Sequence, residues 1–133
     1  MPARLLGALW LACAALGCSA GGARTPEGAV QQFIAAAHAG DRAAIYQRLG
    51  PRTRARIEAM QEASRRTGGR LVTRPEDFLA AGWAQPAWEM AGTRTLREEG
   101  AAAEVEVYSA TGDRHTLSLV REGAEWKVEL PGQ

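Results

Sequence analysis

The stretch TPEGAVQQFIAAAHAGD, residues 25–41, decides how the fold begins. Thr25 can cap the free amides of a helix, Pro26 suits its first position, and Glu27 meets its positive end. The apolar side chains that follow recur at helical spacing: Val30, Phe33, Ile34 and Ala37. Gly40 can end the helix. The stretch therefore predicts an amphipathic helix with one stripe to bury.

Two more helices are expected before any strand. Asp41 can cap a second helix over residues 41–50, and Pro51 can begin a third that turns Ile57 and Met60 inward. A shorter helical turn is predicted over residues 75–84, where Phe78 and Leu79 supply the apolar side chains. The first half of the folded chain is thus predicted to be helical.

The apolar period changes to strict alternation after residue 88, which predicts strands. Three stretches each place one set of side chains on a common face: Ala103, Val105 and Val107; His115, Leu117 and Leu119; Trp126, Val128 and Leu130. Gly-containing turns separate them, and residues 90–100 add a further strand. Residues 88–130 are therefore expected to form a meander of about four antiparallel strands. Helices followed by strands indicate an α+β fold, with the helices on one sheet face.

The opening residues have the layout of an export signal. LLGALWLACAAL, residues 5–16, is uncharged and apolar, but it is shorter than the ~20 residues that a membrane-spanning helix needs. Arg4 precedes this run and small residues follow it, as in a secretory signal. We therefore expect the leader to be removed.

ALGCS, residues 15–19, resembles the lipobox of bacterial lipoproteins, where the cysteine is linked to diacylglycerol and becomes the mature N-terminus. The resemblance implies a signal peptide over residues 1–17 and lipid attachment at Cys18. The alternative is ordinary cleavage after Ala20. Cys13 is the less suitable anchor, because the apolar run before it is only about seven residues long.

If Cys18 is the anchor, residues 18–24 form a lipidated tether and residues 25–133 form a single domain without a thiol. Several acyl chains on one residue hold a protein durably on a bilayer. Ser19 after the cysteine favours the outer membrane by the enterobacterial sorting rule. The expected location is the bacterial cell envelope, facing the periplasm, with the membrane as partner through the anchor.

Composition, charge and motifs give no sign of nucleic-acid binding, of a glycine-rich phosphate loop or of metal binding. The chain has 133 residues, 46% hydrophobic and 23% charged, which is typical of one globular domain. A formal charge of +1 gives no reason to expect nucleic acid. No phosphate-binding glycine motif occurs, and two scattered histidines do not suggest a metal site. We expect no cofactor and no metal, and the sequence does not indicate an oligomeric state.

The arginines between residues 52 and 74 form a basic run: Arg52, Arg54, Arg56, Arg65, Arg66, Arg70 and Arg74. Glu58 and Glu62 lie three or four residues from several of them, a spacing that permits pairing along one helix. We expect a solvated, partly self-paired helix face, and the alternative is a site for phosphate or for an anionic lipid surface.

The order of elements from residue 25 to about residue 131 resembles the nuclear-transport-factor-2-like, cystatin-like cone superfamily, in particular its small bacterial lipoproteins. The AGD break at residues 39–41 and the WKV of residues 126–128 carry the resemblance. It implies a long N-terminal helix across a strongly curved sheet, with a closed core or an open pocket between them. Because such cones include enzymes and binding modules, the fold alone does not define a function.

Candidate pocket residues are few. Enzymes of that superfamily use an inward Asp or an Asp–His pair, and this sequence specifies no such pair. His38 lies near the end of the first helix and His115 at the entrance of a strand, both ordinary rim positions. Trp83 and Trp88 flank a proline-containing join, where they can form an aromatic lip for an apolar ligand or simply pack.

Two functions remain open. The favoured one is a membrane-anchored, non-catalytic domain that binds a small apolar ligand or a protein partner. The alternative is a small acid–base enzyme, isomerase-like or dehydratase-like, that uses His115 or His38.

We predict that Cys18 is lipidated, because a short apolar run ends in LGCS. Mass spectrometry of the mature N-terminus should find Cys18 as the first residue, carrying diacylglycerol. An unmodified chain that begins at Gly21 would contradict the prediction.

Overall fold

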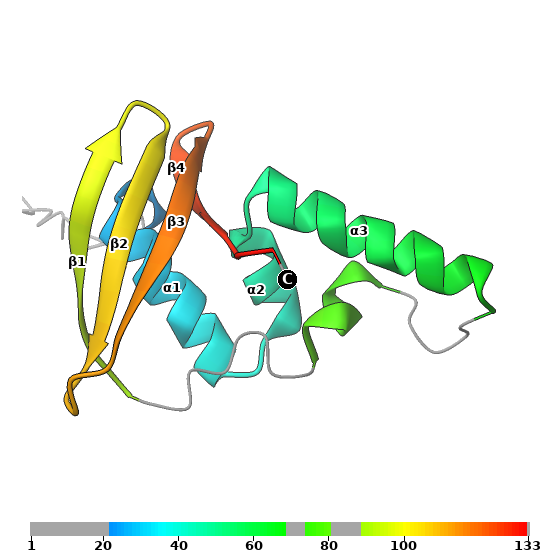
Figure 1. Ribbon diagram of the computed structural model, residues 1–133, viewed down its shortest axis with the longest axis horizontal. Helices are drawn as coiled ribbons and strands as arrows, with labels where there is room; N and C mark the ends of the chain where they lie inside the picture. The colour runs from blue at the N-terminus through cyan, green and yellow to red at the C-terminus, as the bar shows by residue number, and fades with distance from the viewer. Residues whose placement is uncertain (1–21, 69–73, 81–88, 133) are drawn as a thin grey trace, which may run out of the picture.

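The computed structural model describes residues 22–68, 74–80 and 89–132. Its elements, in chain order, are η1 (Gly22–Arg24), α1 (Pro26–His38), α2 (Arg42–Arg48), α3 (Pro51–Arg66), η2 (Pro75–Ala80), β1 (Met90–Glu99), β2 (Ala102–Ser109), β3 (Arg114–Glu122) and β4 (Glu125–Glu129). The strands form one antiparallel sheet in the order β1-β2-β3-β4 (Figure 1). The α+β class and the meander are confirmed.

The first two helices begin where their capping residues predict. The Thr25 hydroxyl accepts a hydrogen bond from the Gly28 amide at 3.1 Å, and the Asp41 carboxylate accepts one from the Ala44 amide at 3.0 Å. Such caps satisfy amides that have no partner inside the helix, and each is worth about 1 kcal/mol. Gly40, with φ of 66°, turns the chain between the helices in a conformation that glycine adopts readily.

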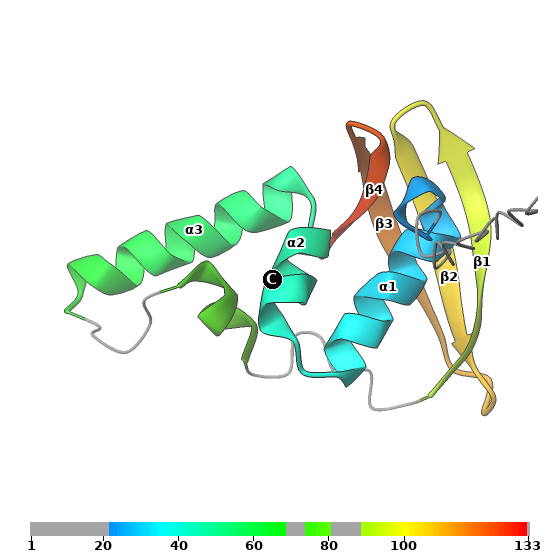
Figure 2. The ribbon, with the colours of Figure 1, turned by 180° about the vertical axis from the view of Figure 1, so that it is seen from behind.

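The core lies between α1 and one face of the sheet, as the views from the two sides show (Figures 1 and 2). The predicted stripe of α1 is buried, and the inward residues of β2, β3 and β4 meet it. The main core side chains are Val30, Phe33, Ile34, Ile45, Leu49, Ile57, Val105, Val107, Leu119, Trp126 and Val128. Helical and alternating periods therefore identified most of the core.

Edge strand β1 is irregular and is partly covered by α1. Its pairing with β2 shifts between Met90 and Gly92 and again between Thr95 and Arg97. Such irregularities bend a strand and increase its twist, which curves the sheet around α1. The Glu27 carboxylate of α1 accepts a hydrogen bond from the Thr95 amide at 2.8 Å. This contact ties the start of α1 to the edge strand.

The helices pack with the sheet as predicted, but α3 does so only at its start. Figure 1 shows α3 pointing away from the sheet beside η2, and only its first turns lie near β4. Ile57 is buried as predicted, but Met60 is 42% exposed. A helical period defines a face of α3 but not what covers it, so it could not show that Met60 lies open to solvent.

Helix α2 is joined to α3 through a tyrosine. The Tyr46 hydroxyl donates a hydrogen bond to the Glu58 carboxylate at 2.7 Å. Burial, and then this contact, raise the pKa of Tyr46 to about 12, so the phenol stays protonated and remains a donor at neutral pH. Leu79 of η2 is buried in the core as predicted. The Phe78 side chain and residues 81–84 of the predicted turn lie outside the described residues.

Only part of the ion pairing made by the arginine run lies along its own helix. Arg66 pairs with Glu62 at 3.1 Å along α3, as the spacing predicts. Arg54, however, pairs with Glu122 of β3 at 2.6 Å, while Glu58 accepts from Tyr46. Arg54 therefore links α3 to the sheet and does not support its own helix.

We predict that Phe33→Ala destabilises the domain by about 3–5 kcal/mol, because it leaves a cavity under α1. Leu96→Ala is the matched control, since Leu96 is apolar but 46% exposed, and it should cost much less. Denaturant melts of both variants make the comparison. A loss for Phe33→Ala no larger than that for Leu96→Ala would contradict the packing described here.

Candidate functional site

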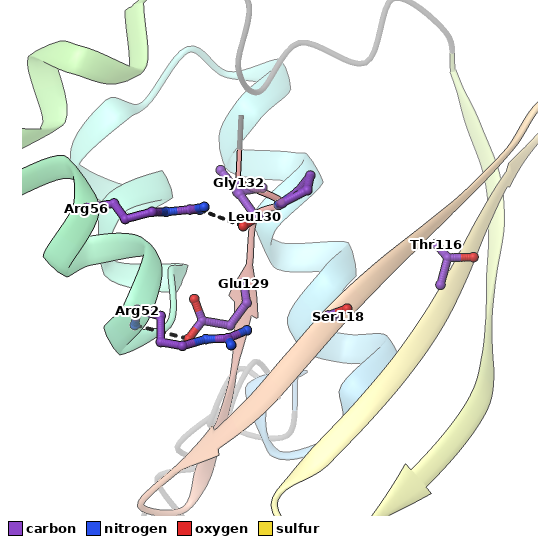
Figure 3. A pocket seen from close by; sticks show the side chains of 8 residues that line it. Arg52, Arg56, Thr116, Ser118, Glu129, Leu130 and Gly132 are labelled. Carbon is purple, nitrogen blue, oxygen red and sulfur yellow. Dashed lines mark hydrogen bonds between the residues drawn. The ribbon is translucent and has the colours of Figure 1, made fainter. Parts of the chain in front are cut away.

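A hollow of about 470 Å³ lies between the start of α3, strand β3 and the segment that follows β4. Its walls are Arg52, Arg56, Thr116, Ser118, Glu129, Leu130, Pro131 and Gly132. In Figure 3, Arg52 extends from α3 toward Glu129 and Arg56 toward Leu130, and Thr116 and Ser118 lie across from them on β3. The volume is within the range of small-molecule sites.

The Glu129 carboxylate in this wall caps α3 from outside the helix. Gly50 precedes α3 and supplies no side-chain cap. One Glu129 oxygen accepts from the Arg52 amide at 3.2 Å, and the other accepts from the Thr53 amide at 2.8 Å and from the Thr53 hydroxyl. A carboxylate at a helix N-terminus satisfies free amides and is stabilised by the helix dipole.

Thr53 completes the link between α3 and the end of β4. Its side chain is fully buried, and its hydroxyl accepts a hydrogen bond from the Leu130 amide at 2.9 Å. The Gly50 amide donates to the Val128 carbonyl at 2.8 Å. A Cβ atom at Gly50 would collide with the Glu129 side chain, so glycine permits this close approach. These contacts fix one wall of the hollow.

The arginines of the wall keep their charge unpaired among the described residues. Arg56 donates to the Leu130 carbonyl at 2.6 Å, a neutral acceptor that orients the guanidinium. Its Nε is buried and has no hydrogen-bond partner within the described part of the chain. Within that part, neither Arg52 nor Arg56 lies within 4.0 Å of a carboxylate oxygen as an ion pair. The wall therefore presents positive charge.

A second hollow, of about 390 Å³, shares Arg52, Ser118 and Glu129 with the first. It extends toward β1 and β2, where its walls include Arg97, Glu99 and Glu104. Arg97 pairs with Glu104 at 3.8 Å. This end is therefore more acidic than the end beside Arg56, and the two hollows together form a surface with a positive and a negative side.

The histidines proposed from the sequence do not line these hollows. His115 pairs with Val107 across the sheet and shares the alternation of Leu117 and Leu119, as predicted, but it lies at the strand entrance and is exposed. His38 is the last residue of α1 and is also exposed. The structure therefore does not bring either histidine to the site beside α3.

The aromatic lip was predicted from Trp83 and Trp88, which lie outside the described residues, as does Cys18, the predicted lipid attachment site. Within the described ranges, no group of three or more His, Cys, Asp or Glu side chains is arranged to hold a metal ion. In the same ranges, no helix has the length and apolar character needed to cross a bilayer.

From the sequence we expect Arg52 and Arg56 on a solvated helix face, with a phosphate or anionic-lipid site as the alternative, and the residues opposite them are not identified. The available signal was their spacing of four residues directly after Pro51, which puts both on one side of the first turns of a helix. The β3 residues opposite them, Thr116 and Ser118, alternate with the inward residues and therefore belong to the outer sheet face. Only the folded chain brings the two sets together.

Comparisons with known proteins do not assign the site. No family model, curated protein or solved structure matches the chain. The resemblance to the cone superfamily therefore stays a prediction. A function for this chain has to be argued from the geometry of its own residues.

We predict that Thr53→Val destabilises the fold by about 1–3 kcal/mol, because it leaves the Leu130 amide without its acceptor and removes one of the donors to Glu129. Thr53→Ser is the matched control, since it keeps the hydroxyl. Chemical denaturation should show the larger loss for valine. Equal losses in the two variants would contradict a stabilising role for the hydroxyl.

Proposed function

We propose that the protein is a lipid-anchored component of the bacterial cell envelope whose folded domain binds another molecule without catalysing a reaction. The anchor is Cys18, and the expected location is the outer membrane, facing the periplasm. Residues 18–24 join the lipid to the domain, and the last three of them form η1, in which Ala23 is buried against the fold. The partners are the membrane, through the lipid, and a ligand or envelope protein held by the domain.

The binding role rests on the hydrogen bonding of Glu129, the carboxylate that lines both hollows. General acid–base catalysis needs a group that can exchange a proton with a reacting atom. Both oxygens of Glu129 accept hydrogen bonds from α3, and Glu129 is only 6% exposed. No histidine lines either hollow. This arrangement favours binding over proton transfer.

The packing under α1 supports the same conclusion. A cone of the kind that the sequence resembles can enclose either a core or an open pocket beneath its long helix. In the described residues this space is occupied by large buried side chains, including Phe33, Val105 and Trp126. The dense apolar packing favours a structural role for this face. Binding is therefore better placed on the opposite side, at the hollow beside α3.

The bound molecule is proposed to be a small, partly apolar ligand or a protein partner. Leu130 and Pro131 give the hollow an apolar side that suits such an occupant. Trp83 and Trp88, whose lip was predicted from the sequence, stay candidate contacts. The alternative, acid–base catalysis by His115 or His38, gains no support from two exposed side chains that line neither hollow.

Native mass spectrometry of the lipidated protein, purified in detergent from its own host, tests the proposal. We expect a bound small molecule or a stoichiometric protein partner to accompany the chain, because binding is its role. A protein that carries neither would contradict the proposal.

Histidine variants separate binding from catalysis in the same experiment. His38→Asn and His115→Asn should retain the bound species in the amount that the wild-type protein carries. An altered small-molecule mass in the His115→Asn or His38→Asn sample would indicate an interrupted reaction and favour the enzymatic alternative.

A further inference from the structure

We propose that the hollow between α3 and β3 binds the carboxylate or phosphate group of a small soluble molecule, with Arg52 and Arg56 as the charged ligands. This inference rests on the proposed binding role and adds the chemical class of the ligand. It does not depend on the lipid at Cys18.

The first argument is the charge left over in the wall. Glu129 is the carboxylate among the residues that line this hollow, and α3 amides and Thr53 already hold both of its oxygens. The helix N-terminus, equivalent to about half a positive charge, offsets part of the Glu129 charge. Arg52 and Arg56 add two positive charges that no described carboxylate pairs with. The hollow therefore attracts an anion.

The position of these two arginines makes their charge informative. On the same helix Arg54 pairs with Glu122 and Arg66 with Glu62. Other arginines also lack an ion pair among the described residues, namely Arg24, Arg48, Arg65 and Arg121, but none of them lines the hollow. Arg52 and Arg56 are therefore the unpaired cations that meet at one concave site.

The second argument is the geometry of the donors. Arg56 is held by the Leu130 carbonyl, so its guanidinium has a fixed orientation before any ligand arrives. A fixed guanidinium can donate two parallel hydrogen bonds to a carboxylate or phosphate. Thr116 and Ser118 line the hollow from β3 (Figure 3), and the Ser118 hydroxyl is a donor on that wall. Donors therefore approach the hollow from two elements.

The third argument concerns the source of the anion. The hollow is larger than a phosphate ion needs, and Leu130 and Pro131 give it an apolar side. The adjoining hollow carries Glu99 and the Arg97–Glu104 ion pair, so the positive charge does not continue across it as a broad basic face for an anionic bilayer would. A small molecule with one anionic group and an apolar part suits this surface better than a lipid headgroup within a membrane.

Nuclear magnetic resonance of the purified, isotope-labelled full chain tests the proposal, with inorganic phosphate and acetate as probes. We expect saturable shifts of the Arg56 Nε–H signal and of the Arg52 and Ser118 amides. Sodium chloride at matched ionic strength should not cause them. Arg52→Gln, which removes an exposed side chain, should weaken probe binding by about tenfold, the effect expected for one hydrogen bond to a charged group.

Matched variants decide between a site and general attraction. Arg65→Gln removes the same charge from the same helix away from the hollow and should leave binding unchanged. Arg56→Lys keeps the charge but loses the planar guanidinium that can donate two parallel hydrogen bonds. It should weaken binding while the protein stays folded. Equal weakening by Arg52→Gln and Arg65→Gln, or the absence of saturable shifts, would overturn the proposal. Shifts that appear with phosphatidylglycerol vesicles but not with the soluble probes would also overturn it, in favour of a membrane contact.

The experiment separates this inference from the proposed function. If the anion probes fail while native mass spectrometry still finds a bound molecule, the binding role stands and the ligand class proposed here is wrong. If both fail, the proposed function is wrong as well.

Discussion

The contact between Glu129 and the start of α3 determines how the two halves of the fold are joined. Helix α3 begins after Gly50, which has no side chain to accept from the first amides, and a carboxylate from β4 fills that role. Because the partners are more than 70 residues apart, the cap exists only once the sheet has formed. The direction of α3, and with it the wall formed by Arg52 and Arg56, depends on this contact.

Most of the fold follows from local sequence signals, and the exceptions share one cause. Thr25, Asp41 and Pro51 marked helix starts correctly, and alternation in residues 101–130 gave the strands and their inward faces. Each signal acts over a few residues. Met60, by contrast, has the spacing of an inward residue and is exposed, because a period defines a face and not what covers it.

The candidate site could not be assembled from the sequence, because local signals do not show which elements lie side by side. Its residues come from α3, from the outer face of β3 and from the segment after β4, and each set has an ordinary local explanation. Arg52 and Arg56 fit a solvated helix face, while Thr116 and Ser118 fit the polar side of a strand. His38 and His115 are candidates because imidazole is a common acid–base group, but residue type alone does not bring side chains together.

The sheet separates the structural side of the molecule from the side that is free to interact. Under α1 the inward residues of β2 and β4 are fully buried, so a change there alters packing and stability. On the outer face, cross-strand ion pairs such as Arg94–Glu106 and Arg97–Glu104 bring opposite charges together, and exposed pairs of this kind contribute little to stability. Where this face meets α3, Glu129 satisfies the helix amides, and the helix N-terminus offsets part of its negative charge. Arg52 and Arg56 outnumber this one carboxylate, so the hollow keeps a net positive charge. The contact that fixes α3 on the sheet therefore also brings these two arginines to the wall of the hollow.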